Sequence, residues 1–347
     1  MQIEVKTKKG AIAYPAQPQE PLLYAALRAG VALPYECATG TCGTCKARRL
    51  SGVVINDWSE APGRQFLKPE RDEVLMCQTR ALSDCAFEVP GNADLAVAPQ
   101  PRPSFGEARI ERIERLTADV AALHLSLARP IEFVAGQFAV LRAPQIAGFR
   151  AYSMVNYARP TTAIEFVIKR KPEGKFTDWL FSQAAPGDLL EWFGPVGKAV
   201  FDPHEQRTIL AIAGGSGIAS IVSILEAGCA VGHFDAFAAS IFFGVRTNSD
   251  IFYLDRLNGF AAQFPERLKV TVVLSHDRPS EELRRRYPLI GFESGFPHEI
   301  AARDLAGDFA GRVAYLAGPP ILVDVAIRML VTQARLPARD IRYDKFS

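Results

Sequence analysis

The hydrophobic and polar positions at the start of the chain repeat with two different periods. Residues 2–6 and 11–14 alternate apolar and polar side chains around the turn "KKG", which predicts two short strands. Residues 20–30, "EPLLYAALRAG", have apolar side chains at helical spacing, with a proline in the first turn and a glycine at the end. They predict a helix. The run "CAFEVP" (85–90) reads as a closing strand.

The pattern changes after a stretch rich in proline, alanine and glycine, "PGNADLAVAPQPRPSFG" (90–106), which is typical of a linker. Short strand-like runs follow up to about residue 203: "EARIERIERL", "DVAALHLSL", "QFAVLRAP", "AIEFVIKR" and "LLEWFG". The helical stretch "FTDWLFSQA" interrupts them. Many short strands without regular helices predict an antiparallel β-barrel.

From about residue 204 strands and helices alternate: "TILAIAG", "IASIVSILEAG", "FAASIFFGV", "DIFYLDRLNGFAAQF", "LKVTVVLS", "RVAYLAG" and "ILVDVAIRMLVTQA". Such alternation predicts an open, mostly parallel α/β sheet. We therefore expect a multidomain chain of α+β and α/β type. Its predicted parts are a first domain at 1–92, a linker at 93–105, a β-barrel domain at 106–203 and an α/β domain at 204–347.

Charge and hydropathy exclude several classes of function. The 347 residues carry a formal net charge of +2, and no lysine or arginine block suggests nucleic-acid binding. The N-terminus has no apolar segment of a secretory signal. The apolar run 208–225 is broken by three glycines, which favours a strand, turn and helix over a membrane span. We expect a cytoplasmic protein.

The segment "CATGTCGTC" concentrates candidate chemistry. Cys37, Cys42 and Cys45 are separated by four and two residues, and Cys77 follows after thirty-one more. This is the C-x4-C-x2-C…C spacing of plant-type [2Fe–2S] clusters. The two glycines of the loop permit the positive φ angles that a tight wrap around the irons requires.

Other uses of these thiols fit less well. Structural zinc usually shows two C-x2-C pairs, and disulfides are rare in cytoplasmic proteins. Four buried thiols without a ligand would be a coincidence at this spacing. Cys85 and Cys229 match no ligand spacing and read as small core residues.

Further motifs follow in order along the chain: "FVAGQF" (133–138), "RAYSMVN" (150–156), "IKRKPEGKFTDWL" (168–180) and "GDLLEWFGPVG" (187–197). The glycine turn of "ILAIAGGSGIASIVSIL" would present a helix N-terminus to a pyrophosphate, although its spacing is not G-x-G-x-x-G. A purely structural turn would explain these glycines nearly as well.

Together these motifs resemble a known family. The first ninety or so residues resemble a plant-type ferredoxin domain, which implies a β-grasp fold. The remainder resembles the ferredoxin–NADP⁺ reductase superfamily, and the fused order is similar to the reductase components of bacterial multicomponent oxygenases. The resemblance covers essentially the whole chain. It implies three redox groups: a [2Fe–2S] cluster on Cys37, Cys42, Cys45 and Cys77, FAD, and NADH or, less favoured, NADPH.

For FAD the resemblance assigns the R-x-Y-S motif. Arg150 would contact the pyrophosphate, Tyr152 would pack along the flavin ring, and Ser153 would approach flavin N5, the hydride acceptor. A core strand with a surface arginine is the structural alternative. The remaining residues implied at the flavin are Met154, Ile168, Lys169, Gly174, Lys175, Phe176 and Thr177.

The resemblance implies that two segments contact the nicotinamide coenzyme. They are the glycine turn and "YLAGPP" (315–320), which is similar to the family's C-G-P-P motif. The implied contacts are Gly214, Gly215, Ser216, Gly217, Gly318 and Pro319. Two positions depart from the family: Ala317 stands where many relatives have Cys, and Ser220 where many have Pro. Ala317 removes a thiol near the nicotinamide, yet hydride transfer needs only proximity and alignment.

The coenzyme's identity and the C-terminus carry weaker signals. Asp250 would repel a 2′-phosphate and so favour NADH, with Arg246 in the same site, but Asp250 could equally be a helix cap. The basic run "ELRRR" (282–286) could instead neutralise a phosphate.

Phe346 stands where relatives place an aromatic near the flavin, and core packing explains it equally well.

These parts imply an electron-transfer reductase of the ferredoxin–NAD⁺ reductase type (EC 1.18.1.-). NADH gives two electrons, a [2Fe–2S] cluster carries one, and a flavin converts between them. The expected acceptor is a terminal oxygenase, of diiron or ring-hydroxylating type, that activates O₂ on a hydrocarbon or aromatic substrate, or an intermediate ferredoxin. A reductase for quinones or small acceptors stays open, whereas a redox sensor would need neither the flavin motifs nor the GGSG and AGPP pair.

Overall fold

The computed structural model describes residues 1–90 and 101–346, which pack as two compact units. The first unit holds Met1–Ala108, Ala139–Ala151 and Leu189–Val196, and the second holds Arg109–Phe138, Tyr152–Asp188 and Gly197–Ser347. Most of the predicted linker, 93–100, lies outside the described residues, and its last two positions already begin a strand at Ser104.

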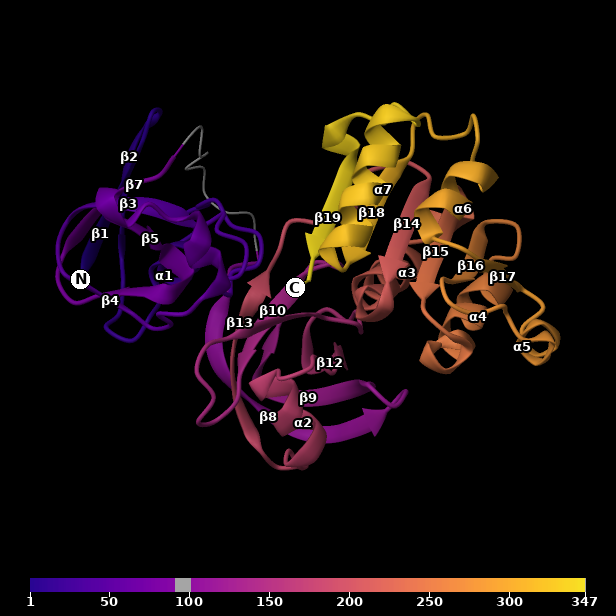
Figure 1. The fold of residues 1–347 in the computed structure, drawn as a ribbon, viewed down its shortest axis with the longest axis horizontal. Coiled ribbons are helices and arrows are strands. Elements are labelled where there is room, and N and C mark those ends of the chain that lie inside the picture. The colour runs from indigo at the N-terminus through magenta and orange to yellow at the C-terminus, as the bar shows by residue number, and fades with distance from the viewer. Residues whose placement is uncertain (91–100, 347) are drawn as a thin grey trace. The chain divides into compact units, whose positions relative to one another are not determined.

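The N-terminal part of the first unit is a five-stranded sheet of order β2-β1-β7-β3-β5 with one helix, the β-grasp arrangement (Figure 1). β1 runs antiparallel to β2 and parallel to β7. Its elements are β1 Gln2–Thr7, β2 Gly10–Pro15, α1 Leu22–Arg28, β3 Lys46–Ser51, β5 Glu73–Leu75 and β7 Cys85–Glu88. β4 Val54–Asn56 and β6 Thr79–Ala81 form a separate antiparallel pair.

Burial explains why these segments fold as predicted. Ile3 and Val5 of β1 are fully buried, as period-two alternation requires of a strand with one face on a core. Helix α1 buries every residue from Leu22 to Leu27. It therefore lies in the core of the domain, and residues 29–36 connect it to the loop of cysteines.

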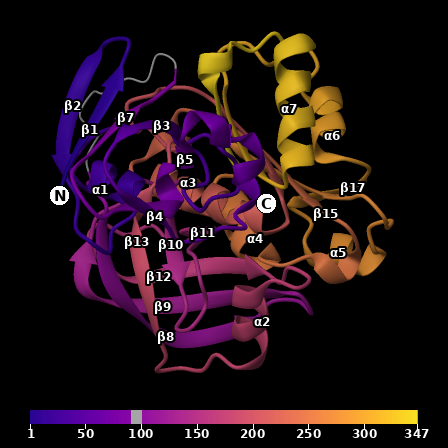
Figure 2. The ribbon, with the colours of Figure 1, turned by 60° about the vertical axis from the view of Figure 1, so that its left-hand side comes forward.

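A second, six-stranded antiparallel sheet curls as a half-barrel, with order β11-β10-β13-β8-β9-β12. Its elements are β8 Ser104–Arg115, β9 Val120–Ile131, β10 Phe138–Arg142, β11 Arg150–Ser153, β12 Thr161–Lys169, α2 Lys175–Ser182 and β13 Leu189–Val196. Figure 2 shows β8, β9 and β12 side by side, with α2 at one end of them. Many short apolar runs without regular helices predicted these strands, and β10 and most of β13 are buried.

The third sheet, in the second unit, is parallel, with order β17-β16-β15-β14-β18-β19. Its strands are β14 Ile209–Gly214, β15 Ala239–Val245, β16 Leu268–Leu274, β17 Ile290–Ser294, β18 Val313–Gly318 and β19 Ile341–Lys345. The helices are α3 Ile218–Ala230, α4 Leu254–Gln263, α5 Glu281–Arg286, α6 Pro297–Asp304 and α7 Pro320–Thr332.

Both faces of this sheet are covered (Figure 1). Alternate residues of β14 belong to two different cores: Ile209 and Ala211 pack with α3 and α4, whereas Leu210 and Ile212 pack with α6 and α7. All six residues of β14 and of β18 are buried, which is why these segments read as continuous apolar runs.

One predicted helix is shorter than expected. The segment 250–264 was predicted to be helical throughout, but the helix begins only at Leu254 because Tyr253 has a φ of 63° and cannot continue it. Helices α5 and α6 and strands β17 and β19 were not predicted, because they are short and have weak periodicity.

Candidate functional site

The thiol loop wraps tightly because two of its glycines adopt positive φ angles that are costly for other residues. Gly40 and Gly43 have φ angles of 86° and 77°. A Cβ atom on Gly40 would lie 2.8 Å from the Gln78 side chain, and one on Gly43 would lie 2.7 Å from the Phe66 ring. The glycines therefore let the backbone turn under its neighbours while it aims the cysteine side chains.

The four cysteines lie in two pairs. The Sγ atoms of Cys45 and Cys77 are 3.2 Å apart. Interaction with the Cys42 side chain lowers the pKa of the Cys37 thiol to about 4. Cys45 and Cys77 are buried, while Cys37 and Cys42 are partly exposed. The loop thus supplies three of the sulfur ligands, and the fourth, Cys77, comes from the 3-10 turn Met76–Gln78.

Backbone amides of the same loop point at the sulfur atoms. The N–H groups of Thr39 and Thr41 donate to Cys37 Sγ at 3.4 Å each, and Thr44 N donates to Cys42 Sγ at 3.5 Å. Such donors stabilise negative charge on thiolate ligands and tune the potential of a bound cluster.

The pairing discriminates between the possible metals. Among residues 1–90 and 101–346, no three His, Cys, Asp or Glu side chains gather around one point as a single metal ion would require. A tetrahedral zinc site needs all its ligands around one ion, whereas a binuclear cluster takes two thiolates on each iron. The residues present therefore fit a [2Fe–2S] cluster better than zinc.

The predicted flavin strand is β11, which carries Arg150, Tyr152 and Ser153. Ser153 is 4% exposed, and its Oγ has no hydrogen-bond partner. Because buried hydroxyls in native proteins are nearly always paired, this atom fits a bound group that supplies the partner. The Tyr152 ring lies 5.4 Å from that of Phe176, which is also predicted at the flavin.

Arg150 has an aromatic neighbour that the sequence did not reveal. Within the first unit its guanidinium carbon lies 5.1 Å from the centroid of the Trp58 ring, a cation–π distance. Its Nη1 donates to the Phe149 carbonyl at 3.0 Å. These contacts orient the guanidinium without neutralising it, so its charge is available to an anion.

The predicted pyrophosphate segment is ordered by Thr177. Its hydroxyl accepts from Lys171 N at 3.1 Å, and a Cβ on Gly174 would lie 2.6 Å from that hydroxyl. Gly174 therefore permits the close turn that leads into α2.

The other residues predicted at the flavin have different surroundings. Lys169 forms an ion pair of 2.9 Å with Asp119, and Lys175 is exposed. Met154 and Ile168 are fully buried. Their assignment to the flavin stays a prediction.

The two nicotinamide motifs meet at the carboxyl edge of the parallel sheet. β14 lies beside β18, with Ala213 opposite Ala317, and the strand order reverses direction there. A Cβ on Gly217 would lie 2.3 Å from the Ala317 carbonyl oxygen, and one on Gly318 would lie 3.0 Å from the Gly214 oxygen. Dinucleotides bind at such switch points, and only glycines allow this backbone contact.

Other predicted coenzyme residues surround this edge. Gly215 has a φ of 53° and open space beside it, and Phe346 N donates to the Gly318 carbonyl at 3.0 Å. The terminal aromatic thus follows β19 to the same edge. Ser216 is partly exposed and Pro319 exposed.

Asp250 takes part in a cap. Its carboxylate accepts from the backbone N and the hydroxyl of Thr247, at 2.9 and 2.8 Å, which forms a capping box on a short 3-10 turn. Asp250 therefore takes part in a helix cap, which was the alternative to a coenzyme contact, although the N-cap residue is Thr247. Arg246 is exposed after β15. The contact of Asp250 and Arg246 with the coenzyme stays a prediction.

An ionic network that the sequence gave no reason to expect joins barrel strand β12 to helices α3 and α4 in the second unit. Arg256 pairs with Glu165 at 3.2 Å and contacts Glu226, and Glu226 accepts from Tyr157 N at 2.7 Å. Burial and the Glu165 charge raise the pKa of Tyr253, which hydrogen bonds to Glu165.

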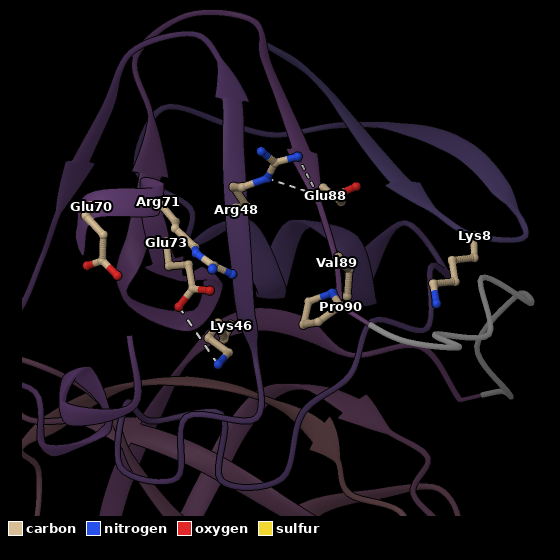
Figure 3. Close-up of a pocket in the computed structure, with 9 residues that line it drawn as sticks. All are labelled: Lys8, Lys46, Arg48, Glu70, Arg71, Glu73, Glu88, Val89 and Pro90. Carbon is tan, nitrogen blue, oxygen red and sulfur yellow. Dashed lines mark hydrogen bonds and ion pairs between the residues drawn. The ribbon is translucent and has the colours of Figure 1, made fainter. Parts of the chain in front are cut away.

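A hollow of about 570 Å³ lies elsewhere, on the β-grasp domain (Figure 3). It is lined by charged residues of β3, β5 and β7 and their neighbours, and pairs such as Arg48–Glu88 and Lys46–Glu73 cross it. No predicted flavin or coenzyme residue lines it. Its cations are largely matched by carboxylates, so we assign it no ligand.

Family models match three successive parts of the chain. A 2Fe–2S iron–sulfur cluster binding domain matches residues 6–82, an oxidoreductase FAD-binding domain 107–201, and an oxidoreductase NAD-binding domain 211–327. The chain is therefore an iron–sulfur flavoprotein oxidoreductase, in which a ferredoxin domain precedes a reductase module.

Relatives of full length narrow this class. The ferredoxin–NAD⁺ reductase component of the alkene monooxygenase system of Xanthobacter autotrophicus is 36% identical over 94% of this chain and 95% of the relative. The reductase component of phenol 2-monooxygenase from Pseudomonas sp. strain CF600 is 33% identical over 94% and 89%. The chain belongs to this family of oxygenase-system reductases.

Solved structures agree. The ferredoxin reductase of carbazole 1,9a-dioxygenase superposes with a TM-score of 0.83 at 32% identity and covers 100% of this chain and 99% of its own. Amycolatopsis cytochrome P450 reductase GcoB superposes with a TM-score of 0.80 at 30% identity, over 99% and 98%. In the parts of the chain that the structure describes, no helix is long and apolar enough to cross a bilayer.

Proposed function

We propose that this protein is the reductase component of an oxygenase system, which draws electrons from NADH and delivers them singly to a terminal oxygenase or its ferredoxin. The observation that carries this proposal is the 3.2 Å contact of Cys45 with Cys77, two of four cysteines at cluster spacing, in a domain that matches a 2Fe–2S cluster binding family. A one-electron carrier is needed only if the acceptor takes electrons one at a time. The full-length relatives are reductase components of such systems.

The bound groups supply the redox chemistry: FAD accepts the electron pair of NADH, and a [2Fe–2S] cluster carries one electron at a time. The chain binds and orients these groups. The four cysteines would ligate the irons, and the N–H groups of the loop would stabilise charge on their sulfur atoms.

At the flavin, the Arg150 fork would bind a pyrophosphate oxygen, and the Ser153 hydroxyl would find the partner that it lacks. Tyr152 would pack along the ring. The backbone of Gly214–Gly217 and of Gly318 and Pro319 would hold the coenzyme at the switch point, with Phe346 at the same edge.

Analysis of purified protein tests the first half of this proposal. Material prepared without oxygen should contain about two irons with matching acid-labile sulfide and one FAD per chain. Zinc in place of iron would contradict it.

Replacing the reductase of a related oxygenase system with this protein tests the proposed delivery of electrons to an oxygenase. Added to the oxygenase of the alkene monooxygenase system in place of its own reductase, the protein should support NADH-dependent product formation. NADH consumption with quinones alone, and none with any oxygenase or ferredoxin, would instead identify a reductase for small acceptors.

A further inference from the structure

Tyr24 connects the first helix to the thiol loop. It lies in α1, is fully buried, and its hydroxyl donates to the Ala38 carbonyl oxygen at 2.9 Å. Ala38 follows the first cysteine and has a φ of 57°, a left-handed conformation that is costly for a residue with a Cβ. The hydroxyl therefore holds the loop at a strained position.

The contact reaches a sulfur ligand through one peptide group. The Ala38 carbonyl and the Thr39 N–H belong to the same planar unit, and Thr39 N donates to Cys37 Sγ at 3.4 Å. Because the unit is planar, fixing its oxygen also fixes the direction of its N–H. Tyr24 thus orients one of the donors that act on the Cys37 sulfur.

The ring of Tyr24 makes a second, independent contact within the first unit. It stacks on Phe193 of barrel strand β13, with centroids 4.4 Å apart and planes 6° apart. Phe149 meets it edge-on at 5.5 Å, and Phe105 lies at 5.9 Å. Tyr24 and Phe193 are fully buried and Phe149 is 5% exposed, so the stacked pair is shielded from water, whereas Phe105 is 40% exposed.

We propose that Tyr24 is a positioning residue for internal electron transfer: its ring holds the cluster domain on barrel strand β13, and its hydroxyl sets the donor to Cys37. This inference rests on the proposed function, because it takes the loop to hold a cluster and the barrel to hold FAD. The step that it serves moves one electron from reduced FAD to the oxidised cluster, with NADH as the source. No bond of Tyr24 forms or breaks.

The two contacts can be removed separately. Tyr24→Phe keeps the stack but deletes the hydroxyl, which frees the Ala38–Thr39 peptide. Weaker N–H donation to sulfur destabilises the more negative, reduced cluster. The midpoint potential of the cluster, followed by the EPR signal of its reduced form, should become more negative.

Phe193→Leu removes the stack from the barrel side and leaves the hydroxyl in place. It should slow flavin-to-cluster electron transfer about tenfold or more, since small displacements of reacting groups have large effects on rate. The potential should stay at its wild-type value. Reduction of the flavin by NADH, followed in the same stopped-flow trace, is the internal reference.

Tyr14→Phe is the matched control. Tyr14 is equally buried in the same domain, and its hydroxyl donates to the Leu22 carbonyl of the same helix at 3.1 Å, away from the thiol loop. It should change neither quantity. A Tyr24→Phe potential equal to that of Tyr14→Phe, together with an unchanged rate in Phe193→Leu, would overturn the inference.

A failure of the proposed function would look different. If no oxygenase or ferredoxin accepts electrons but both internal groups are reduced by NADH, the acceptor assignment is wrong and the Tyr24 result still stands. If Tyr24→Phe does not fold, Phe193→Leu still tests the positioning, because it leaves the cluster domain unaltered. A wild-type rate in that variant would count against the inference.

Discussion

The thiol loop and the glycine turn each prepare a site for a redox group, but they use different parts of the chain. The loop at Cys37–Cys45 acts through side chains, whose type and spacing are set by the irons. The turn at Gly214–Gly217 acts through the absence of side chains, because its backbone meets that of Ala317 and Gly318. Three of the four cluster ligands are therefore specified by one local segment, whereas the backbone site needs a second segment a hundred residues away.

The largest predicted effect is the loss of one ligand from the loop. Cys42→Ser should abolish reduction of a one-electron protein acceptor, because the cluster needs all four thiolates. NADH-to-ferricyanide activity at the flavin should persist. Cys229→Ser, a half-buried thiol outside the loop, is the control. Loss of both activities in Cys42→Ser with FAD retained would contradict the proposed order of electron transfer.

Flavin reduction by NADH should be almost as sensitive to one methyl group added to the glycine turn. Gly217→Ala would place a Cβ 2.3 Å from the Ala317 oxygen, which forces the turn away from β18. Flavin reduction by NADH should slow by roughly a hundredfold, as a displacement of about 1 Å can cause. Gly259→Ala, in helix α4 with open space around it, makes the same change harmlessly. Equal stopped-flow rates for the two variants would show that backbone contact is not what the turn needs.

The contrast between these regions explains what the sequence could and could not predict. The cysteine spacing was sufficient to predict a [2Fe–2S] domain, and the apolar runs of β14 and β18 predicted buried parallel strands. The short elements α5, β17, α6 and β19 were not predicted, because segments of 5 to 8 residues with weak periodicity give little evidence of a helix or strand.

Contacts made by ordinary aromatic and charged residues were invisible in the sequence. Tyr24 looked like one more apolar position of an amphipathic helix, although its hydroxyl reaches the thiol loop. Trp58 and Arg256 belong to no motif, and their partners Arg150 and Glu165 lie about ninety residues away. Only the folded chain brings such pairs together.

The predicted flavin site is intermediate between the thiol loop, which acts through side chains, and the glycine turn, which acts through backbone. One charged side chain is expected to contribute much of the binding. Arg150→Ala should weaken FAD binding about tenfold to a hundredfold, as loss of a charge-assisted contact does. Flavin content after dialysis and fluorescence titration with FAD measure this. Arg142→Ala, on neighbouring strand β10, removes an arginine from the same unit and should retain FAD. Unchanged FAD affinity in Arg150→Ala would remove this residue from its role.

The smallest predicted effect concerns the choice of coenzyme. Asp250→Ala should raise the kcat/KM for NADPH relative to NADH by roughly fivefold, because a carboxylate near a 2′-phosphate repels it. The variant also breaks the cap with Thr247. Thr247→Ala breaks the same cap and keeps the carboxylate. Equal NADPH-to-NADH ratios in the two variants would assign Asp250 to the cap alone.

The order of electron flow is tested most directly by mixing the wild-type protein with NADH without oxygen, and following flavin absorbance and the cluster EPR signal together. The flavin absorbance should fall first, and the cluster signal should rise afterwards at a rate that is independent of NADH concentration. A cluster signal that rises equally fast in protein stripped of FAD would contradict this account.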